Sequence, residues 1–173
     1  MKTLIVFYSK DGENWYDGKK TFLKEGNGRI ISSYLKELIP DADTFEIKMK
    51  NPYSMDYDIC VKEAYEDQKN HVLPEILNPD FDISGYERIF LVYPIYWESC
   101  PQAVLSFVSH HDFKNKEVIL ISSHEGSGLG SSVYDIQETG KNLHIKKALP
   151  IAGSLARESK DTLQKFLSGI TGF

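Results

Sequence analysis

The segment Arg88-Ile-Phe-Leu-Val-Tyr-Pro94-Ile-Tyr-Trp-Glu98-Ser-Cys-Pro101 contains a short apolar run, a loop with two large aromatic side chains and the start of a helix. Residues 89–92 are continuously apolar, which is typical of a strand covered on both faces of a parallel sheet. Pro94 has no N–H to donate, so we expect the sheet ladder to end there. Tyr96 and Trp97 follow at the carboxyl end of this strand, where open α/β sheets bind their ligands. The pattern predicts a site for a flat aromatic ligand.

Composition narrows the class of protein. The chain has 173 residues, is 41% hydrophobic and 26% charged, and has a net charge of −5. This is the profile of one globular domain with its own core, so we expect a single domain over residues 1–173. The acidic balance argues against nucleic-acid binding, which needs a basic face. Residues 1–8 are apolar over too short a stretch for a signal peptide or a membrane span, and we expect a cytoplasmic protein that does not bind membranes.

The remaining apolar runs predict the topology. Strands that alternate with helices indicate a parallel sheet with right-handed crossovers. We therefore predict an α/β fold, a three-layer doubly wound domain whose five-stranded parallel sheet has the order 2-1-3-4-5. The other strands are expected near residues 4–7, 43–47, 118–121 and 143–152, and the helices near residues 30–38, 56–71, 101–108, 132–138 and 159–170.

Two of these helices carry more detailed expectations. Ser99 is a good capping residue and Pro101 suits a first helical turn, so both are assigned to the start of the helix near residues 101–108. In the helix over residues 56–71, the apolar spacing places four side chains on the inner face. They are Tyr57, Val61, Ala64 and Tyr65.

The long segment Ser9 to Asn27 is expected to be a loop, and long loops in compact domains are often functional. Ser9 and Asn27 offer a hydroxyl and an amide, and the glycines Gly26 and Gly28 let backbone approach closely. The amino end of the following helix favours an anion through its free N–H groups and dipole. The segment therefore predicts a phosphate site, although the glycines can equally serve only to bound a mobile loop. It is not a Walker loop, because no Gly-Lys-Ser/Thr follows.

Residues 94–98 suit an isoalloxazine ring, since Tyr96 or Trp97 can stack on it while backbone groups meet its polar edge. The alternative is that both rings are core or partner-facing anchors. Glu98 either adds negative charge near the ring or is solvated surface.

The segment from Ser122 to Ser131 is expected to be a third loop on the same rim of the sheet. Its Gly126-Ser-Gly128-Leu-Gly130-Ser131 stretch lacks the third glycine of a dinucleotide fingerprint and follows the wrong strand, so a Rossmann site is rejected. The glycines are better explained by backbone that passes close to a flat ring. His124 and Glu125 can act as acid and base or be structural.

Other catalytic chemistry finds little support in the sequence. Cys100, near a helix start, is either redox-active or an inert packing residue. Two cysteines cannot form a disulfide framework, and no Cys/His cluster has the spacing of a metal site. Neither a nucleophile elbow nor an acid pair for hydrolysis is present, so no catalytic residue is assigned.

Four stretches together resemble the flavodoxin family, in particular a short-chain branch with an enlarged first loop. They are Leu4-Ile-Val-Phe-Tyr-Ser9, Glu25-Gly-Asn-Gly28, Phe90-Leu-Val-Tyr-Pro-Ile-Tyr-Trp97 and His124-Glu-Gly-Ser-Gly-Leu-Gly-Ser-Ser132. The resemblance implies a flavodoxin-like sheet and a non-covalent FMN site, with Ser9 and Asn27 at the phosphate. Residues Pro94, Ile95, Tyr96, Trp97 and Glu98 would lie along the ring and ribityl chain, and Ser123, His124, Glu125, Gly126, Ser127 and Gly128 on the other side of the ring.

One position departs from the family pattern. Members usually carry Thr where this chain has Gly28, so a hydroxyl is missing from the expected phosphate cradle. Loop backbone or Lys10 is then expected to replace it.

Three functions remain open at this point. The first is an electron carrier whose flavin edge docks redox partner proteins transiently through acidic residues such as Glu98 and Glu125. The second is an NAD(P)H-dependent FMN or quinone oxidoreductase on the same fold, because fold alone does not separate the two. The third is an interaction domain that has lost its flavin. The physiological donor and acceptor and the oligomeric state stay undetermined by sequence.

Overall fold

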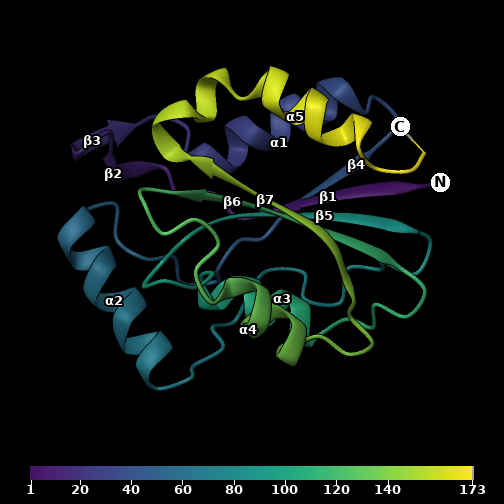
Figure 1. The fold of residues 1–173 in the computed structure, drawn as a ribbon. Coiled ribbons are helices and arrows are strands. Elements are labelled where there is room, and N and C mark those ends of the chain that lie inside the picture. Colours follow the sequence, from purple (N-terminus) through teal and green to yellow (C-terminus); the bar gives the residue numbers. More distant parts are fainter. Residues whose placement is uncertain (173) are drawn as a thin grey trace.

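A parallel sheet of five strands runs through the middle of the computed structural model, which describes residues 1–172 (Figure 1). The strand order is β4-β1-β5-β6-β7, which is the predicted order 2-1-3-4-5 once the strands outside this sheet are left out of the numbering. The predicted fold class is therefore confirmed. The strands are β1 (Thr3–Phe7), β4 (Asp43–Glu46), β5 (Arg88–Pro94), β6 (Glu117–His124) and β7 (Ile145–Ala152).

Helices cover both faces of this sheet. On one face lie α1 (Asn27–Leu38) and α5 (Lys160–Ser168), and on the other lie α3 (Gln102–Ser109) and α4 (Ser132–Thr139) (Figure 1). The 3₁₀ helix η1 (Gly153–Glu158) connects β7 to α5. Because both faces are covered, the central strands β1 and β5 are buried almost throughout, which explains their continuous apolar sequence.

The segment between β1 and α1 differs from the expected loop. It contains an antiparallel hairpin of β2 (Gly12–Tyr16) and β3 (Lys19–Leu23). The turn residues Asp17 and Gly18 both have positive φ, at 50° and 78°. Two-residue turns of this kind match the twist of the strands and favour Asp-Gly. The prediction of a loop over residues 9–27 is therefore wrong, and the Asp-Gly pair is the sequence signal that was missed.

Helix α2 (Tyr57–Lys69) stands beside the hairpin, at the carboxyl end of the sheet (Figure 1). Asp56 caps it, since its carboxylate accepts the N–H of Ile59 at 2.9 Å. Glu13 of β2 accepts the N–H of Tyr57 at 3.1 Å, so hairpin and helix are joined at this end. The prediction that Tyr65 faces the core is wrong: its side chain is 41% exposed.

Three boundaries also differ from the sequence expectations. Helix α1 begins at Asn27, before Gly28. The strand β6 continues through residues 122–124, which were expected in a loop, because all three pair with β7 and the first two also pair with β5. Ser99 does not cap α3, whose N-cap is Pro101. The Ser99 hydroxyl instead donates to the Asp135 carboxylate at 2.5 Å, a charge-assisted hydrogen bond.

Candidate functional site

A cavity of about 310 Å³ opens at the carboxyl end of the sheet. It lies beyond the ends of β1 and β5, where the strand order reverses. Doubly wound sheets bind their ligands at this position. The structure brings ten of the predicted site residues to its walls: Lys10, Asn27, Pro94, Ile95, Tyr96, Trp97, Ser123, His124, Glu125 and Ser127.

The hairpin and α2 supply a further wall that sequence reasoning missed. Trp15 of β2 and Tyr57 of α2 lie side by side, with ring centroids 6.0 Å apart. The hairpin also reaches across the cavity, where the Tyr16 hydroxyl donates to the carbonyl of Ser154 in η1 at 3.2 Å. The cavity residues absent from the prediction are Asn14, Trp15, Tyr57, Cys60, Val61, Ala64 and Gly153.

At one end of the cavity the chain packs closely around the amino end of α1. A Cβ at Gly28 would lie 2.2 Å from the carbonyl oxygen of Tyr8, so no larger residue fits without moving β1 or α1. A Cβ at Gly26 would lie 2.3 Å from the carbonyl oxygen of Lys10. The first contact explains why this chain needs glycine at position 28, where the family resemblance leads one to expect Thr. The Ser9 hydroxyl accepts the N–H of Arg29 at 3.1 Å and thus closes the first turn.

Two N–H groups remain available at this helix end. The first N–H groups of a helix have no acceptor within the helix. Within residues 1–172, the backbone N–H groups of Asn27 and Gly28 make no hydrogen bond. Asn27 also lines the cavity. The amino end of α1 can therefore donate to an anion that enters from the cavity.

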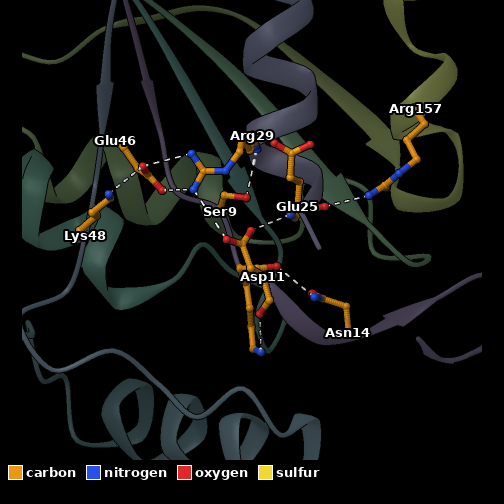
Figure 2. A network of polar contacts seen from close by, with 10 residues as sticks. Ser9, Asp11, Asn14, Glu25, Arg29, Glu46, Lys48 and Arg157 are labelled. Atoms are coloured by element: carbon orange, nitrogen blue, oxygen red, sulfur yellow. Dashed lines mark hydrogen bonds and ion pairs between the residues drawn. The ribbon is translucent and has the colours of Figure 1, made fainter. Parts of the chain in front are cut away.

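Charged side chains surround this helix end (Figure 2). Arg29 makes two hydrogen bonds to the Glu46 carboxylate, at 2.6 Å and 3.2 Å. Lys48 contacts the same carboxylate at 3.3 Å. Arg157 of η1 donates to the side-chain oxygen of Asn27 at 3.1 Å and to the carbonyl of Glu25 at 2.8 Å. Arg157 thereby fixes the Asn27 side chain at the cavity wall.

The opposite end of the cavity is formed by the aromatic segment after β5. Trp97 is 48% exposed, and its indole N–H donates to the carbonyl of Val61 in α2 at 3.0 Å. Its ring centroid lies 4.9 Å from that of Tyr65. The half-buried Tyr96 packs edge-on against Tyr8, with the two ring centroids 6.2 Å apart. Both predicted aromatic residues therefore line the cavity, but Trp97 is anchored on α2.

The backbone of this segment is strained. Trp97 and Glu98 have φ angles of 49° and 63°, which cost non-glycine residues roughly 1–2 kcal/mol each. The N–H of Ser131 donates to the Glu98 carbonyl at 2.7 Å and holds the turn. A Cβ at Gly130 would lie 1.9 Å from the same carbonyl oxygen, so glycine is required there. Strain of this size is found where a site must be held in one geometry.

The segment after β6 forms the third wall. The His124 Nδ1 atom accepts the N–H of Gly126 at 3.0 Å, so Nε2 carries the proton of the neutral ring. Partial burial raises the pKa of the Glu125 carboxyl. A Cβ at Gly153 would lie 2.3 Å from a Glu125 carboxylate oxygen, which places that carboxylate against η1.

Five predicted residues lie outside the cavity wall. Ser9 and Gly28 belong to the first turn of α1. The Glu98 side chain is exposed and its carbonyl is held by Ser131. Gly126 and Gly128 have positive φ, at 125° and 63°, so backbone conformation accounts for both glycines.

The two cysteines are packing residues. Cys60 and Cys100 are 4% and 2% exposed. Burial raises the pKa of the Cys60 thiol to about 11 and that of Cys100 to about 12. Both thiols are therefore protonated at neutral pH, which argues against the redox-active alternative for Cys100.

The flavodoxin family model matches residues 22–169. The chain belongs to the flavodoxin family. The resemblance predicted from the sequence is thus confirmed. No curated protein matches the sequence of this flavodoxin. No helix within residues 1–172 combines the length and apolar character that crossing a bilayer requires.

Solved structures of other proteins share the fold. A protein of Bacteroides eggerthii described as a flavoprotein has a TM-score of 0.77 at 20% identity, with 99% of each chain covered. One of Bacteroides uniformis has a TM-score of 0.66 at 21% identity, covering 95% of this chain and 97% of that chain. A flavoprotein of Lactobacillus acidophilus in complex with FMN has a TM-score of 0.64 at 18% identity, covering 94% and 98%.

Proposed function

We propose that this flavodoxin binds FMN in the cavity at the carboxyl end of the sheet and acts in electron transfer. The observation that carries the proposal is one cavity with aromatic side chains at one end and the free N–H groups of α1 near the other. A flavin mononucleotide combines a flat aromatic ring with a phosphate, so its two ends match the two ends of the cavity. The FMN complex of the Lactobacillus acidophilus relative supports the same cofactor.

In this proposal each wall has a distinct task. Residues 94–97 and 123–127 contact the ring, while Asn27 and the amino end of α1 hold the phosphate. Lys10 stabilises the backbone next to the phosphate end, because its ammonium donates to the carbonyls of Asp11 and Glu13, at 3.3 Å and 3.1 Å. When bound, FMN supplies the electron-transfer chemistry. The protein holds the ring, limits its contact with water and sets the charge around it.

Transient redox partners fit the charge of the chain. Its net charge is −5, and the acidic residue Glu125 lines the cavity while the exposed Glu98 lies beside it. Acidic side chains at an exposed cofactor edge steer basic partners into short-lived complexes. The expected partners are therefore redox proteins with a basic docking face.

A specific observation favours a second candidate, an NAD(P)H-dependent FMN or quinone oxidoreductase. Asn14, Trp15 and Tyr57 form a wall of the cavity that comes from the hairpin and α2. Such a wall gives a small flat acceptor a surface to stack on beside the flavin. An electron carrier does not need this wall.

The first experiment adds FMN to the purified apoprotein and follows flavin fluorescence. Both redox functions require bound FMN, so we expect the flavin fluorescence to be quenched at micromolar protein concentration. Absence of quenching would refute both redox functions and leave an interaction domain without flavin. Where FMN binds, steady oxidation of NADH or NADPH with a quinone would establish the oxidoreductase and exclude a pure carrier.

A further inference from the structure

The amino end of α1 already holds an anion that belongs to the protein. One oxygen of the Asp11 carboxylate accepts the N–H of Gly26, the N-cap of α1, at 2.8 Å (Figure 2). The other oxygen lies 3.8 Å from the Arg29 guanidinium. The neighbouring N–H groups of Asn27 and Gly28 are those expected to receive the phosphate. Asp11 therefore shares the amino end of the helix with the phosphate group.

The position of Asp11 is fixed by its surroundings. The backbone around Lys10 lies so close to α1 that a Cβ at Gly26 would be 2.3 Å from the Lys10 carbonyl oxygen. The Asn14 side chain donates to the carbonyls of Lys10 and Gly12, at 3.0 Å and 3.1 Å. The turn into β2 is thus closed on both sides of Asp11. The carboxylate stays at the helix end because the hairpin begins there.

Nearby cations pair mainly with other groups, and the Arg157 guanidinium donates to Asn27 and to the Glu25 carbonyl. The Arg29 guanidinium lies 2.6 Å from the Glu46 carboxylate but 3.8 Å from Asp11, so most of its pairing is with Glu46. Lys48 also pairs with Glu46. The Lys10 ammonium donates to backbone carbonyls. A phosphate at the adjacent N–H groups would therefore meet the negative charge of Asp11 at short range, which opposes binding.

We infer that Asp11 is a specificity-determining residue that competes with the phosphate of the ligand and narrows the preference for FMN over riboflavin. This inference rests on the proposed function, because it concerns the same flavin site. Riboflavin carries the same ring without the phosphate, so Asp11 affects its binding little. The protein consequently accepts both flavins with affinities that differ by less than about tenfold, or about 1.4 kcal/mol.

The test compares FMN and riboflavin titrations of the wild-type chain and of Asp11→Asn, followed by flavin fluorescence. Asn keeps an acceptor for the Gly26 N–H but removes the charge. We expect Asp11→Asn to tighten FMN binding about tenfold and to change riboflavin binding less than about twofold. Asp11→Ser, a second neutral acceptor, should act in the same direction and covers the case in which Asp11→Asn folds poorly.

Glu25→Gln is the matched control, because it removes one charge from the exposed residue next to Gly26. It should change the ratio of the two affinities less than about twofold, since its side chain is not hydrogen-bonded to the helix end. Equal changes for both flavins in the Asp11 variants, or weaker FMN binding, would overturn the role of Asp11 while leaving the flavin site intact. Absence of binding by either flavin to any variant would instead overturn the proposed function and this inference with it.

Discussion

The two ends of the cavity are built by different means. At the α1 end, short polar contacts and glycines bring β1, the hairpin and the helix together, and Gly28 has no room for a side chain. At the aromatic end, Trp97 is half exposed and is held by one indole hydrogen bond and a strained turn. The first end depends on close backbone packing, and the second on large side chains over a fixed turn. Substitutions at the α1 end should therefore affect protein stability and binding of the phosphate group. Substitutions at the aromatic end should affect binding of the flavin ring.

The largest effect is expected where backbone packing is tightest. Gly28→Ala should lower the free energy of unfolding by about 2–3 kcal/mol, because the new methyl group would overlap the Tyr8 carbonyl. Urea denaturation measures this change. Gly85→Ala is the control, since a Cβ there meets nothing within 4 Å and should change stability by less than about 0.5 kcal/mol. Equal effects of the two substitutions would show that the α1 end is loosely packed.

The next effect concerns the aromatic end. Trp97→Ala should weaken FMN and riboflavin alike by about tenfold, since the loss of an aromatic contact costs roughly 0.5–1.5 kcal/mol beyond the buried area. It should also shift the midpoint potentials of bound flavin, which redox titration measures. Phe22→Ala on β3 is the control, because its side chain is 67% exposed and does not line the cavity. Unchanged affinities and potentials would mean that the ring is held elsewhere.

A smaller and more selective effect is expected at the α1 end. Ser9→Ala removes the acceptor of the Arg29 N–H. Loss of this hydrogen bond, about 1 kcal/mol, should weaken FMN binding about fivefold but riboflavin binding less than about twofold. Fluorescence titration with both flavins gives the two values. Ser33→Ala, on the exposed side of α1, should leave both unchanged. Equal losses for the two flavins would remove Ser9 from any role at the phosphate.

The smallest effect is a pH dependence at Glu125. Its pKa is raised by partial burial, so the ionised carboxylate makes the folded state less stable at neutral pH. This penalty falls as the pH drops through the folded-state pKa and is gone below the ordinary value of about 4.3. Glu125→Gln should therefore stabilise the apoprotein at pH 7, by less than about 1 kcal/mol because the group is partly solvated.

Denaturation of the Glu125→Gln variant at pH 7 and near pH 4 measures this dependence. The exposed Glu138→Gln on α4 is its control. A gain in stability that persists unchanged near pH 4 would exclude the ionised carboxylate as the cause.

The sheet could be predicted from sequence because its central strands are buried on both faces and therefore continuously apolar. The convergence of the segments after β1, β5 and β6 followed from topology alone. The hairpin could not be found by the same criterion, since most of its residues are partly exposed and lack a continuous apolar run. The apolar spacing correctly placed Ala64 on the inner face of α2, but the use of that face as a cavity wall escaped prediction, because long-range packing decides where the helix lies.

Contacts between residues far apart in the chain account for the remaining differences. Ser99 is drawn from its expected helix cap by Asp135, and Trp97 is held by Val61. The role of Gly28 rests on the closeness of one carbonyl oxygen, which no local pattern reveals. Residue types therefore indicated where a site would lie, while its exact walls depended on tertiary contacts.

The Asp11 carboxylate has a consequence for the order of events after synthesis. A helix terminus that carries its own anion is partly compensated before any small molecule arrives. The phosphate of a flavin then binds beside an anion that stays in place, at a helix end whose first N–H group is already occupied.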